Sequence, residues 1–218
     1  MRTDTGAAGV PLRPVARAFF ARAVLDVARD LIGCLLVHET PDGRVVGRIV
    51  ETEAYGRDDP GSHAARGPTP RNAPMFEAPG RAYVYFTYGM HWCVNAVTDR
   101  VGVPGAVLLR AVEPVEGIDV MGARRREDPK APSRPIPVRD LARGPARLTQ
   151  AFAIGAGHDR ADLTRPPLFI AMGERFPDEA ILTSPRIGLG TAQDGRRWRF
   201  TLKGSPYVSG TRGLTRSG

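Results

Sequence analysis

Apolar residues near the N-terminus recur three or four positions apart, at Phe20, Val24, Val27 and Leu31. This spacing predicts a helix over residues 19–31. Two apolar segments follow, 34–38 and 45–54, and the turn sequence Thr40-Pro41-Asp42-Gly43 lies between them, which predicts an antiparallel hairpin. A helix that leads into an antiparallel hairpin favours an α+β fold over a wound parallel sheet.

The pattern continues along the chain with β-branched and aromatic segments, which favour strands, at 81–88, 92–98, 105–112, 168–172, 186–189 and 198–202. Helices are predicted at 113–126 and 148–154. We therefore expect one α+β domain at 15–210, in which a mostly antiparallel, curved β-sheet is flanked by helices and long loops. Residues 1–14 are predicted to form a flexible arm, and 211–218 a frayed tail.

Two polar segments show neither the apolar spacing of a helix nor that of a strand. Residues 56–80 contain five prolines, and residues 127–138 combine proline with charge. Long segments of this kind in a compact domain are usually functional or disordered. We expect the first to border a binding site and the second to be mobile.

Composition adds a polyanionic partner to this picture. The chain of 218 residues carries a formal net charge of +8 and has a sequence pI of about 10.3. This excess of positive charge indicates a negatively charged binding partner, such as nucleic acid or a membrane surface. An arginine bias of the source genome would give the same charge and pI. No apolar run approaches the roughly 20 residues of a membrane span, and the N-terminus lacks the apolar segment of a signal peptide. We expect an intracellular protein without a membrane partner.

Cysteine and histidine do not indicate a metal site. Cys34 and Cys93 each lie in an apolar run, which predicts buried thiols rather than a disulfide. The four histidines are scattered, and no pair of cysteines has zinc-ligand spacing. We expect neither a metal nor a cofactor.

Candidate chemistry begins with Glu51, Glu53 and Tyr55, which alternate along one strand and so share a face. Two neighbouring carboxylates repel each other unless cations offset them. One interpretation is a solvated face with arginine partners. The other is a carboxylate, held near basic groups, that activates a water molecule.

The aromatic run 83–92 is the second candidate. Tyr83 and Tyr85 share a strand face, and Phe86 on the other face is predicted to enter the core. Tyr88 precedes a glycine at a hairpin tip and is expected to be exposed. It could cap a turn, join a protein interface, or enter a DNA base stack as a wedge. Tyr55, Tyr85 and His63 could together form a stacking slot for one planar base.

Polar residues elsewhere leave two interpretations open. The loop arginines Arg57, Arg66 and Arg71 could contact phosphates or be ordinary surface charges. Asn95 and Arg110 lie in apolar strands, where an isolated polar group needs a structural partner or a ligand. Met75 and Phe76 are predicted to belong to the core.

Several motifs, taken together, resemble the alkyladenine (3-methyladenine) DNA glycosylase family. They are Gly47 to Tyr55, Thr69-Pro70-Arg71-Asn72 with Met75-Phe76, Tyr83-Val84-Tyr85 with Tyr88-Gly89-Met90, Asn95, Val107 to Pro114, Gly144 to Leu148 and Gly204 to Ser209. The resemblance covers residues 19–209 and implies a DNA glycosylase that flips alkylated or deaminated purines out of double-stranded DNA.

The resemblance also implies residue roles. Glu53 would activate the attacking water. Tyr55 and Tyr85 would stack on the flipped base, with His63 on its opposite side, and Tyr88 would fill the gap left in the duplex. The remaining roles are exclusion of guanine by Asn95, support of the neighbouring nucleotide by Arg110, and contacts with DNA around the lesion by Thr69, Arg71, Met75 and Met90.

Lysine usage refines the expected reaction. A glycosylase that also cuts the strand forms a Schiff base through an amine, and the only lysines, Lys130 and Lys203, lie outside the motifs. We therefore expect a monofunctional, monomeric enzyme that leaves an abasic site. The alternatives are a non-catalytic nucleic-acid-binding module and an RNA-binding accessory domain, since one fold can host unrelated functions.

Overall fold

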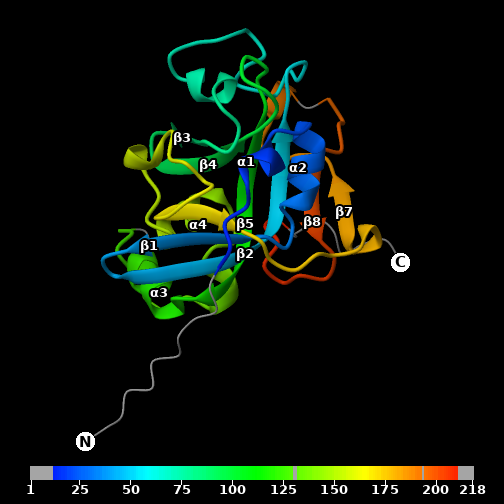
Figure 1. Ribbon diagram of the computed structural model, residues 1–218. Coiled ribbons are helices and arrows are strands. Elements are labelled where there is room, and N and C mark those ends of the chain that lie inside the picture. Colours follow the sequence, from blue (N-terminus) through cyan, green and yellow to red (C-terminus); the bar gives the residue numbers. More distant parts are fainter. Residues whose placement is uncertain (1–11, 130–131, 193, 211–218) are drawn as a thin grey trace, which may run out of the picture.

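Eight strands form one antiparallel sheet in the computed structural model, which describes residues 12–129, 132–192 and 194–210. The sheet order is β3-β4-β5-β2-β1-β6, and β8 pairs with both β2 and β7 (Figure 1). The strands are β1 (Leu35–Thr40), β2 (Gly43–Tyr55), β3 (Ala82–Thr87), β4 (His91–Val97), β5 (Ala106–Glu116), β6 (Leu168–Ala171), β7 (Ile181–Ser184) and β8 (Arg199–Leu202). The predicted α+β fold with an antiparallel sheet is confirmed.

The long strand β2 organises the sheet. Its first half pairs with β1, its second half pairs with β8 on the same side, and β5 runs along its other side. The β2–β5 register shifts between Ile49 and Glu51 and again between Glu51 and Thr52. Such irregularities bend a strand and increase its twist, and these two lie on either side of Glu51.

Four α-helices cover the sheet: α1 (Arg17–Phe20), α2 (Val24–Asp30), α3 (Ile118–Arg126) and α4 (Pro145–Ala151). Helix α2 packs against β2, whereas α4 packs against β4, β5 and α3 (Figure 1). The main core lies between these layers. Gly47 permits the close approach of the layers, because a Cβ atom there would lie 2.5 Å from a Val112 methyl and 3.0 Å from the Phe152 ring.

The segment between β2 and β3 arches over one end of the sheet (Figure 1) and contains a 3₁₀ helix, η1 (Ala73–Phe76). Met75 is buried there against Tyr83, Val97 and Ala106, and Phe76 packs beside them. The predicted core positions of Met75 and Phe76 are confirmed. This small cluster fixes the long loop to the sheet, at the place where the pocket described below lies.

The single helix predicted over 19–31 is wrong, because the chain leaves the helical path at Ala21–Ala23. The Arg22 side chain donates to the carbonyl of Phe19, and the Arg22 carbonyl accepts a bond from the distant Asp99 amide. These bonds take carbonyl groups that a continuous helix would need. No glycine or proline marks the break in the sequence.

The helix predicted over 113–126 also begins later, because β5 continues to Glu116. Glu113 and Glu116 pair with Arg48 and Arg44 of β2, at 2.6 Å and 2.8 Å. The chain turns at Gly117, where φ is +72° and a Cβ atom would clash with the Arg44 carbonyl oxygen, so only glycine fits. Cross-strand pairing therefore outweighs the helical pattern. The third predicted helix, 148–154, is α4 and lies three residues earlier at both ends.

The strand predicted at 186–189 is wrong, and β7 at 181–184 was not predicted. Its four residues pair with β8, whereas residues 185–189 leave the sheet. Most of the predicted arm and the whole predicted tail lie outside the described residues. Within the described part, Met172 donates to the Arg13 carbonyl, and Pro14 bridges to Ala171 at the edge of β6.

None of the helices in the described ranges is long and apolar enough to span a bilayer. Cys34 and Cys93 are buried free thiols, as predicted.

Candidate active site

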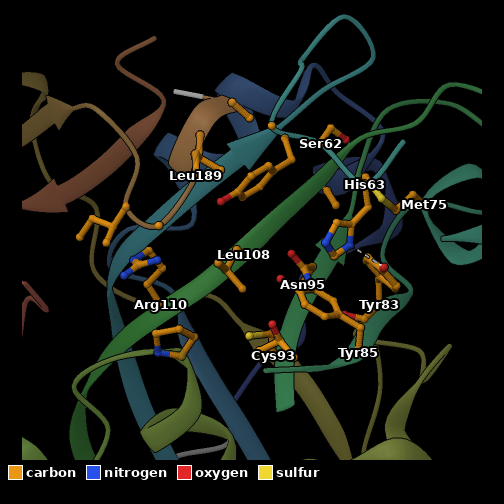
Figure 2. Close-up of a pocket in the computed structure, with 18 of the residues that line it drawn as sticks. Ser62, His63, Met75, Tyr83, Tyr85, Cys93, Asn95, Leu108, Arg110 and Leu189 are labelled. Carbon is orange, nitrogen blue, oxygen red and sulfur yellow. Dashed lines mark hydrogen bonds between the residues drawn. The ribbon is translucent and has the colours of Figure 1, made fainter. Parts of the chain in front are cut away.

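A pocket of about 410 Å³ lies where the C-terminal end of β2 meets β3, β4, β5 and two loops. This volume falls within the usual range for small-ligand sites. Figure 2 shows His63, Tyr83 and Tyr85 grouped on one side and Arg110 and Leu189 on the other, with Asn95 and Leu108 between. The loop segments 60–63 and 187–189 also contribute to the lining. Aromatic rings and a few polar groups therefore converge on one cavity.

Glu53 lies behind this pocket and is fully buried. Its Oε2 accepts hydrogen bonds from the Tyr55 hydroxyl at 2.8 Å and from Arg110 Nη1 at 3.1 Å. Its Oε1 accepts a 2.8 Å bond from the backbone N–H of Ile187. All three donors belong to residues that line the pocket. The carboxylate is thus held next to the cavity by the residues that would contact a ligand.

Glu51 has no exposed surface and is surrounded by donors. Its Oε1 accepts from Arg110 Nε at 2.8 Å and Arg199 Nε at 2.7 Å, and its Oε2 accepts from the Ser209 amide at 2.6 Å. Burial alone would raise the pKa of Glu51, but the two guanidinium groups and the Ser209 amide hold that pKa below its usual value. The predicted arginine partners are present. The solvated face is wrong, because β8 and residue 209 cover it.

Arg110 connects the two carboxylates. Burial would lower the pKa of its guanidinium, yet the charges of Glu53 and Glu51 raise it, so Arg110 is a permanent cation. The sequence left open whether Arg110 has a structural partner or a ligand; the structure shows that it has structural partners, the two carboxylates. Arg110 also lines the pocket, so the pairing does not remove it from the site.

Tyr55 forms part of the wall nearest Glu53. Burial, followed by the neighbouring charge of Glu53, raises the pKa of the Tyr55 hydroxyl, so this hydroxyl stays protonated and donates to the carboxylate. On one face of the ring lies the guanidinium of Arg186, with its Cζ 4.6 Å from the ring centroid.

His63, Tyr83 and Tyr85 form the facing wall. His63 Nδ1 lies 2.8 Å from the Tyr83 hydroxyl, and its ring meets Tyr85 edge to face with 4.5 Å between centroids. Although His63 is partly exposed at the mouth of the pocket, partial burial of its ring, and then the charge of Arg71, lower its pKa below the usual 6.5. The resemblance placed His63 opposite Tyr85, whereas here the two rings touch and belong to one wall.

Asn95 lies between the walls and is buried. Its Nδ2 donates to the Tyr83 carbonyl at 3.0 Å, which fixes its amide in a strand whose other neighbours are apolar. Asn95 therefore has both a structural partner and a place in the pocket lining.

The β3–β4 hairpin projects beside the pocket. Tyr88 at its tip is 79% exposed and has a left-handed φ of +51°, which is unusual for a bulky residue and is often kept for function. Met90 is also exposed. Phe86 was predicted to enter the core, but it is 44% exposed and packs on Trp92. The reason is that β5 pairs with β4 only at 95–97, so the outer hairpin has no core beneath it.

The loop residues of the Thr-Pro-Arg-Asn motif have clear positions. Asn72 is buried and donates to the carbonyls of His63 and Gly67, and its Oδ1 accepts from the Thr69 amide. Thr69 and Arg71 are exposed, and Arg71 donates to the Phe86 carbonyl at 3.0 Å. The motif therefore has a buried anchor that shapes the loop and two exposed side chains.

Sequence reasoning missed several groups at this site. Asp59, Arg186 and Arg199 are buried ionic residues that contact Tyr55, Glu51 or the loops, and Ile187 supplies the backbone donor to Glu53. Nothing in the local pattern singles them out, since Arg186 and Arg199 lie in segments that read as plain strands. Ser209 alone among these groups was marked in the sequence, because it lies in the segment 204–209 that resembles the glycosylase family.

Within the described ranges, no cluster of three or more His, Cys, Asp or Glu side chains is arranged to hold a metal ion.

Comparison with known proteins gives a consistent result. A sequence model of methylpurine-DNA glycosylase (MPG) matches residues 18–206. A protein of Carboxydothermus hydrogenoformans, named "Putative 3-methyladenine DNA glycosylase", is 47% identical over 88% of this chain and 97% of its own. Proteins with the same name from Leifsonia xyli (48% identical over 92% and 93%) and Burkholderia orbicola (47% over 96% and 98%) are also similar.

The pocket, the buried carboxylate and these matches define the class: the protein is a DNA glycosylase, a hydrolase of DNA base excision repair. Within that class, the chain belongs to the methylpurine-DNA glycosylase family. The resemblance drawn from the sequence motifs is confirmed. Damaged DNA is accordingly the substrate.

Proposed function

We propose that this enzyme flips alkylated or deaminated purines out of double-stranded DNA and hydrolyses the N-glycosidic bond with a water molecule activated by Glu53. Its substrates would include 3-methyladenine, hypoxanthine and ethenoadenine. One observation carries the proposal: the Glu53 carboxylate lies directly behind an aromatic pocket and is held by Tyr55, Arg110 and the Ile187 amide.

The chemistry requires a negative group at this place. Breaking an N-glycosidic bond builds positive charge on the sugar, as in glycoside hydrolysis. A carboxylate can accept a proton from water and can also stabilise that charge. Because Glu53 has no exposed surface, water reaches it only when a wall residue of the pocket moves. The flipped nucleotide would cause that movement.

Stacking and flipping supply selectivity. The base would lie between Tyr55 on one wall and the His63–Tyr85 pair on the other. Aromatic stacking contributes roughly 1–3 kcal/mol per base, and flipping costs less for a damaged or mispaired base. A cationic alkylated purine leaves without protonation, whereas neutral hypoxanthine needs hydrogen bonds in the pocket.

The remaining residues would position DNA around the lesion. Tyr88, exposed at the hairpin tip, would fill the gap in the duplex. Thr69, Arg71 and Met90 would contact the neighbouring nucleotides. Three pocket residues would also take part: Asn95 would crowd the amino group of guanine, Arg110 would support the nucleotide next to the pocket, and Met75 would contact DNA around the lesion from the buried wall.

The reaction would stop at an abasic site. A strand-cutting glycosylase needs an amine close to the sugar. Lys203 is exposed and does not line the pocket, while Lys130 lies outside the described residues. Borohydride trapping should therefore give no covalent adduct with DNA. We further propose that the enzyme acts as a monomer inside the cell, at the nucleoid, which light scattering of the free protein and tagged-protein imaging would test.

Base release tests the proposal directly. Duplexes of one sequence that carry 3-methyladenine, hypoxanthine, ethenoadenine or no lesion are incubated with the enzyme, and free base is measured by chromatography. We expect release from the damaged duplexes and none from the undamaged one. Binding to damaged duplexes without released base would instead support a non-catalytic module, and preferential binding to duplex RNA would support an RNA-binding domain.

A further inference from the structure

Arg186 and Asp59 form an ion pair whose two side chains have no exposed surface. Arg186 Nη2 donates to Asp59 Oδ1 at 2.7 Å, and Nη1 donates both to Asp59 Oδ2 and to the Ala54 carbonyl, the latter at 2.8 Å. Burying two charges costs several kcal/mol per ion, and a pair repays that cost only with very good geometry. Such a pair is weak evidence for stability, so its place in the fold needs another explanation.

The pair joins the two loops that border the pocket. Asp59 immediately precedes the lining residues Pro60 to His63, and Arg186 immediately precedes Ile187, Gly188 and Leu189. The packing between the loops is close, because a Cβ atom on Gly61 would lie 3.0 Å from Leu189 and 3.1 Å from Arg186. The ion pair therefore closes the pocket wall from behind without entering the pocket.

The same guanidinium reaches the reactive end of the site. Its Cζ lies 4.6 Å from the centre of the Tyr55 ring and 5.3 Å from that of Trp198, so it is placed between the two rings. Arg186 also donates to the carbonyl of Ala54, which directly precedes Tyr55. Ile187, the residue after Arg186, donates its backbone N–H to Glu53. Three groups donate to the Glu53 carboxylate, and Arg186 is next to two of them: it packs on the Tyr55 ring and directly precedes Ile187 in the chain.

We propose that Arg186, clasped by Asp59, is a positioning residue for base release: it fixes the Tyr55 ring and the Ile187 amide, and through them the Glu53 carboxylate. This inference rests on the proposed function. Arginine suits the role because its planar guanidinium can stack on a ring while it donates in its own plane to a carboxylate and a carbonyl. Lysine would keep the charge and lose both the stacking and the forked donation.

Two substitutions separate positioning from simple support of the fold. Arg186→Lys retains the charge pair with Asp59 and removes the planar contact with Tyr55. Arg186→Gln combined with Asp59→Asn removes both charges and leaves neutral amides in their place, which avoids leaving one buried charge unpaired. The control is Arg124→Lys, since Arg124 is also buried, donates to the Ala151 carbonyl and Thr40, and pairs with Asp42, none of which lines the pocket.

For each protein we would measure the single-turnover rate of base release from a hypoxanthine duplex, the dissociation constant for that duplex, and the unfolding midpoint. A small displacement of a catalytic group can slow a reaction by up to about 100-fold. Phosphate contacts, which these variants leave intact, dominate affinity. We call Arg186→Lys and the double variant Arg186→Gln with Asp59→Asn the clasp variants. We expect both to release base about tenfold or more slowly than wild type, with a dissociation constant within about twofold of the wild-type value. Arg124→Lys should retain the wild-type rate although its midpoint falls.

Wild-type rates in both clasp variants would overturn the inference, and so would a rate loss in Arg124→Lys that matches its loss of stability. Either result leaves the proposed function intact if the wild-type enzyme releases base. Absence of base release by the wild-type enzyme would instead contradict the proposed function itself.

Discussion

The Tyr55 hydroxyl donates a 2.8 Å hydrogen bond to Oε2 of Glu53, two residues earlier on the same strand. One side chain thus lines the pocket and also holds the carboxylate behind it. A ligand that moves the Tyr55 ring must alter this bond. If a base stacks on Tyr55 and Glu53 accepts a proton, as proposed, this one hydroxyl group would link the two events.

Replacement of the proposed base should separate binding from chemistry. Glu53→Gln keeps the shape of the side chain but replaces one accepting oxygen with an NH2 group and cannot accept a proton, so we expect base release to fall by about 10²–10⁴-fold while lesion-duplex affinity stays close to wild type. Rapid-quench assays and fluorescence anisotropy would measure the two quantities. Glu113→Gln, which alters a carboxylate outside the pocket that pairs with Arg48, is the matched control. Full activity in Glu53→Gln would refute the assigned role.

Glu51 should control stability in a pH-dependent way. Glu51→Gln leaves Arg110 and Arg199 without their shared anion, and loss of one partner from a buried ionic group costs about 3–5 kcal/mol. The folded pKa of Glu51 lies below its usual 4.5, so the native state binds fewer protons than the unfolded state between those two values. The stabilisation is therefore complete above pH 4.5 and is lost as the pH falls through the folded pKa.

Urea unfolding at neutral and acidic pH would test this expectation. The difference in unfolding free energy between wild type and Glu51→Gln should narrow as the pH falls. Glu116→Gln alters a half-exposed pair with Arg44, and exposed pairs contribute about 0–1 kcal/mol, so this control should change little. A pH-independent difference would show that the charge of Glu51 is not what stabilises the fold.

A substitution at the tip of the β3–β4 hairpin should lower DNA affinity without lowering the stability of the fold. Tyr88 is 79% exposed, so Tyr88→Ala should leave the unfolding midpoint nearly unchanged. If the ring fills the gap left by a flipped base, its loss should reduce lesion-duplex affinity by about tenfold, on the scale of one base-stacking contact. The control is Val101→Ala, which removes another exposed apolar side chain, 68% exposed, from a different loop. Equal affinities for Tyr88→Ala and wild type would exclude the wedge.

His63 should make the lesion preference depend on pH. Its pKa is lowered from 6.5, so the ring is neutral at pH 7 and becomes a cation only as the pH falls below that value. A cation in the wall would repel a positively charged alkylated purine and have less effect on neutral hypoxanthine. The ratio of 3-methyladenine release to hypoxanthine release should therefore fall in acid. In His63→Gln the ratio should stay constant, and an unchanged decline there would assign the effect to another group.

The sequence predicted the sheet better than the helices. Segments rich in apolar, β-branched and aromatic residues mark β1 to β5 because each strand buries one face or both. The break between α1 and α2 had no such mark, since it depends on a bond from Asp99 to the Arg22 carbonyl. The incorrect strand at 186–189 has the same kind of cause: Ile187 and Leu189 alternate as in a strand, but burial of Arg186 against Asp59 draws the segment away from β8.

The site was predicted where residues close in sequence define it. Glu53, Tyr55, Tyr85 and Asn95 were singled out by motif, and the structure brings them to one cavity or directly behind it. The ionic partners could not be predicted, because Arg199 and Ser209 meet Glu51 across 148 and 158 residues. Their contacts follow from the sheet order, which no local pattern contains.

That separation along the chain has a consequence for biosynthesis. Chains fold from the N-terminal end as they leave the ribosome, and β2 with both carboxylates is made early. Arg199 and Ser209 are among the last described residues to emerge. Until they do, Glu51 lacks two of its three partner residues and the strand that covers it. The surroundings of Glu51 are therefore complete only after Ser209 has been synthesised, so we expect a chain interrupted before that residue to lack the proposed catalytic site.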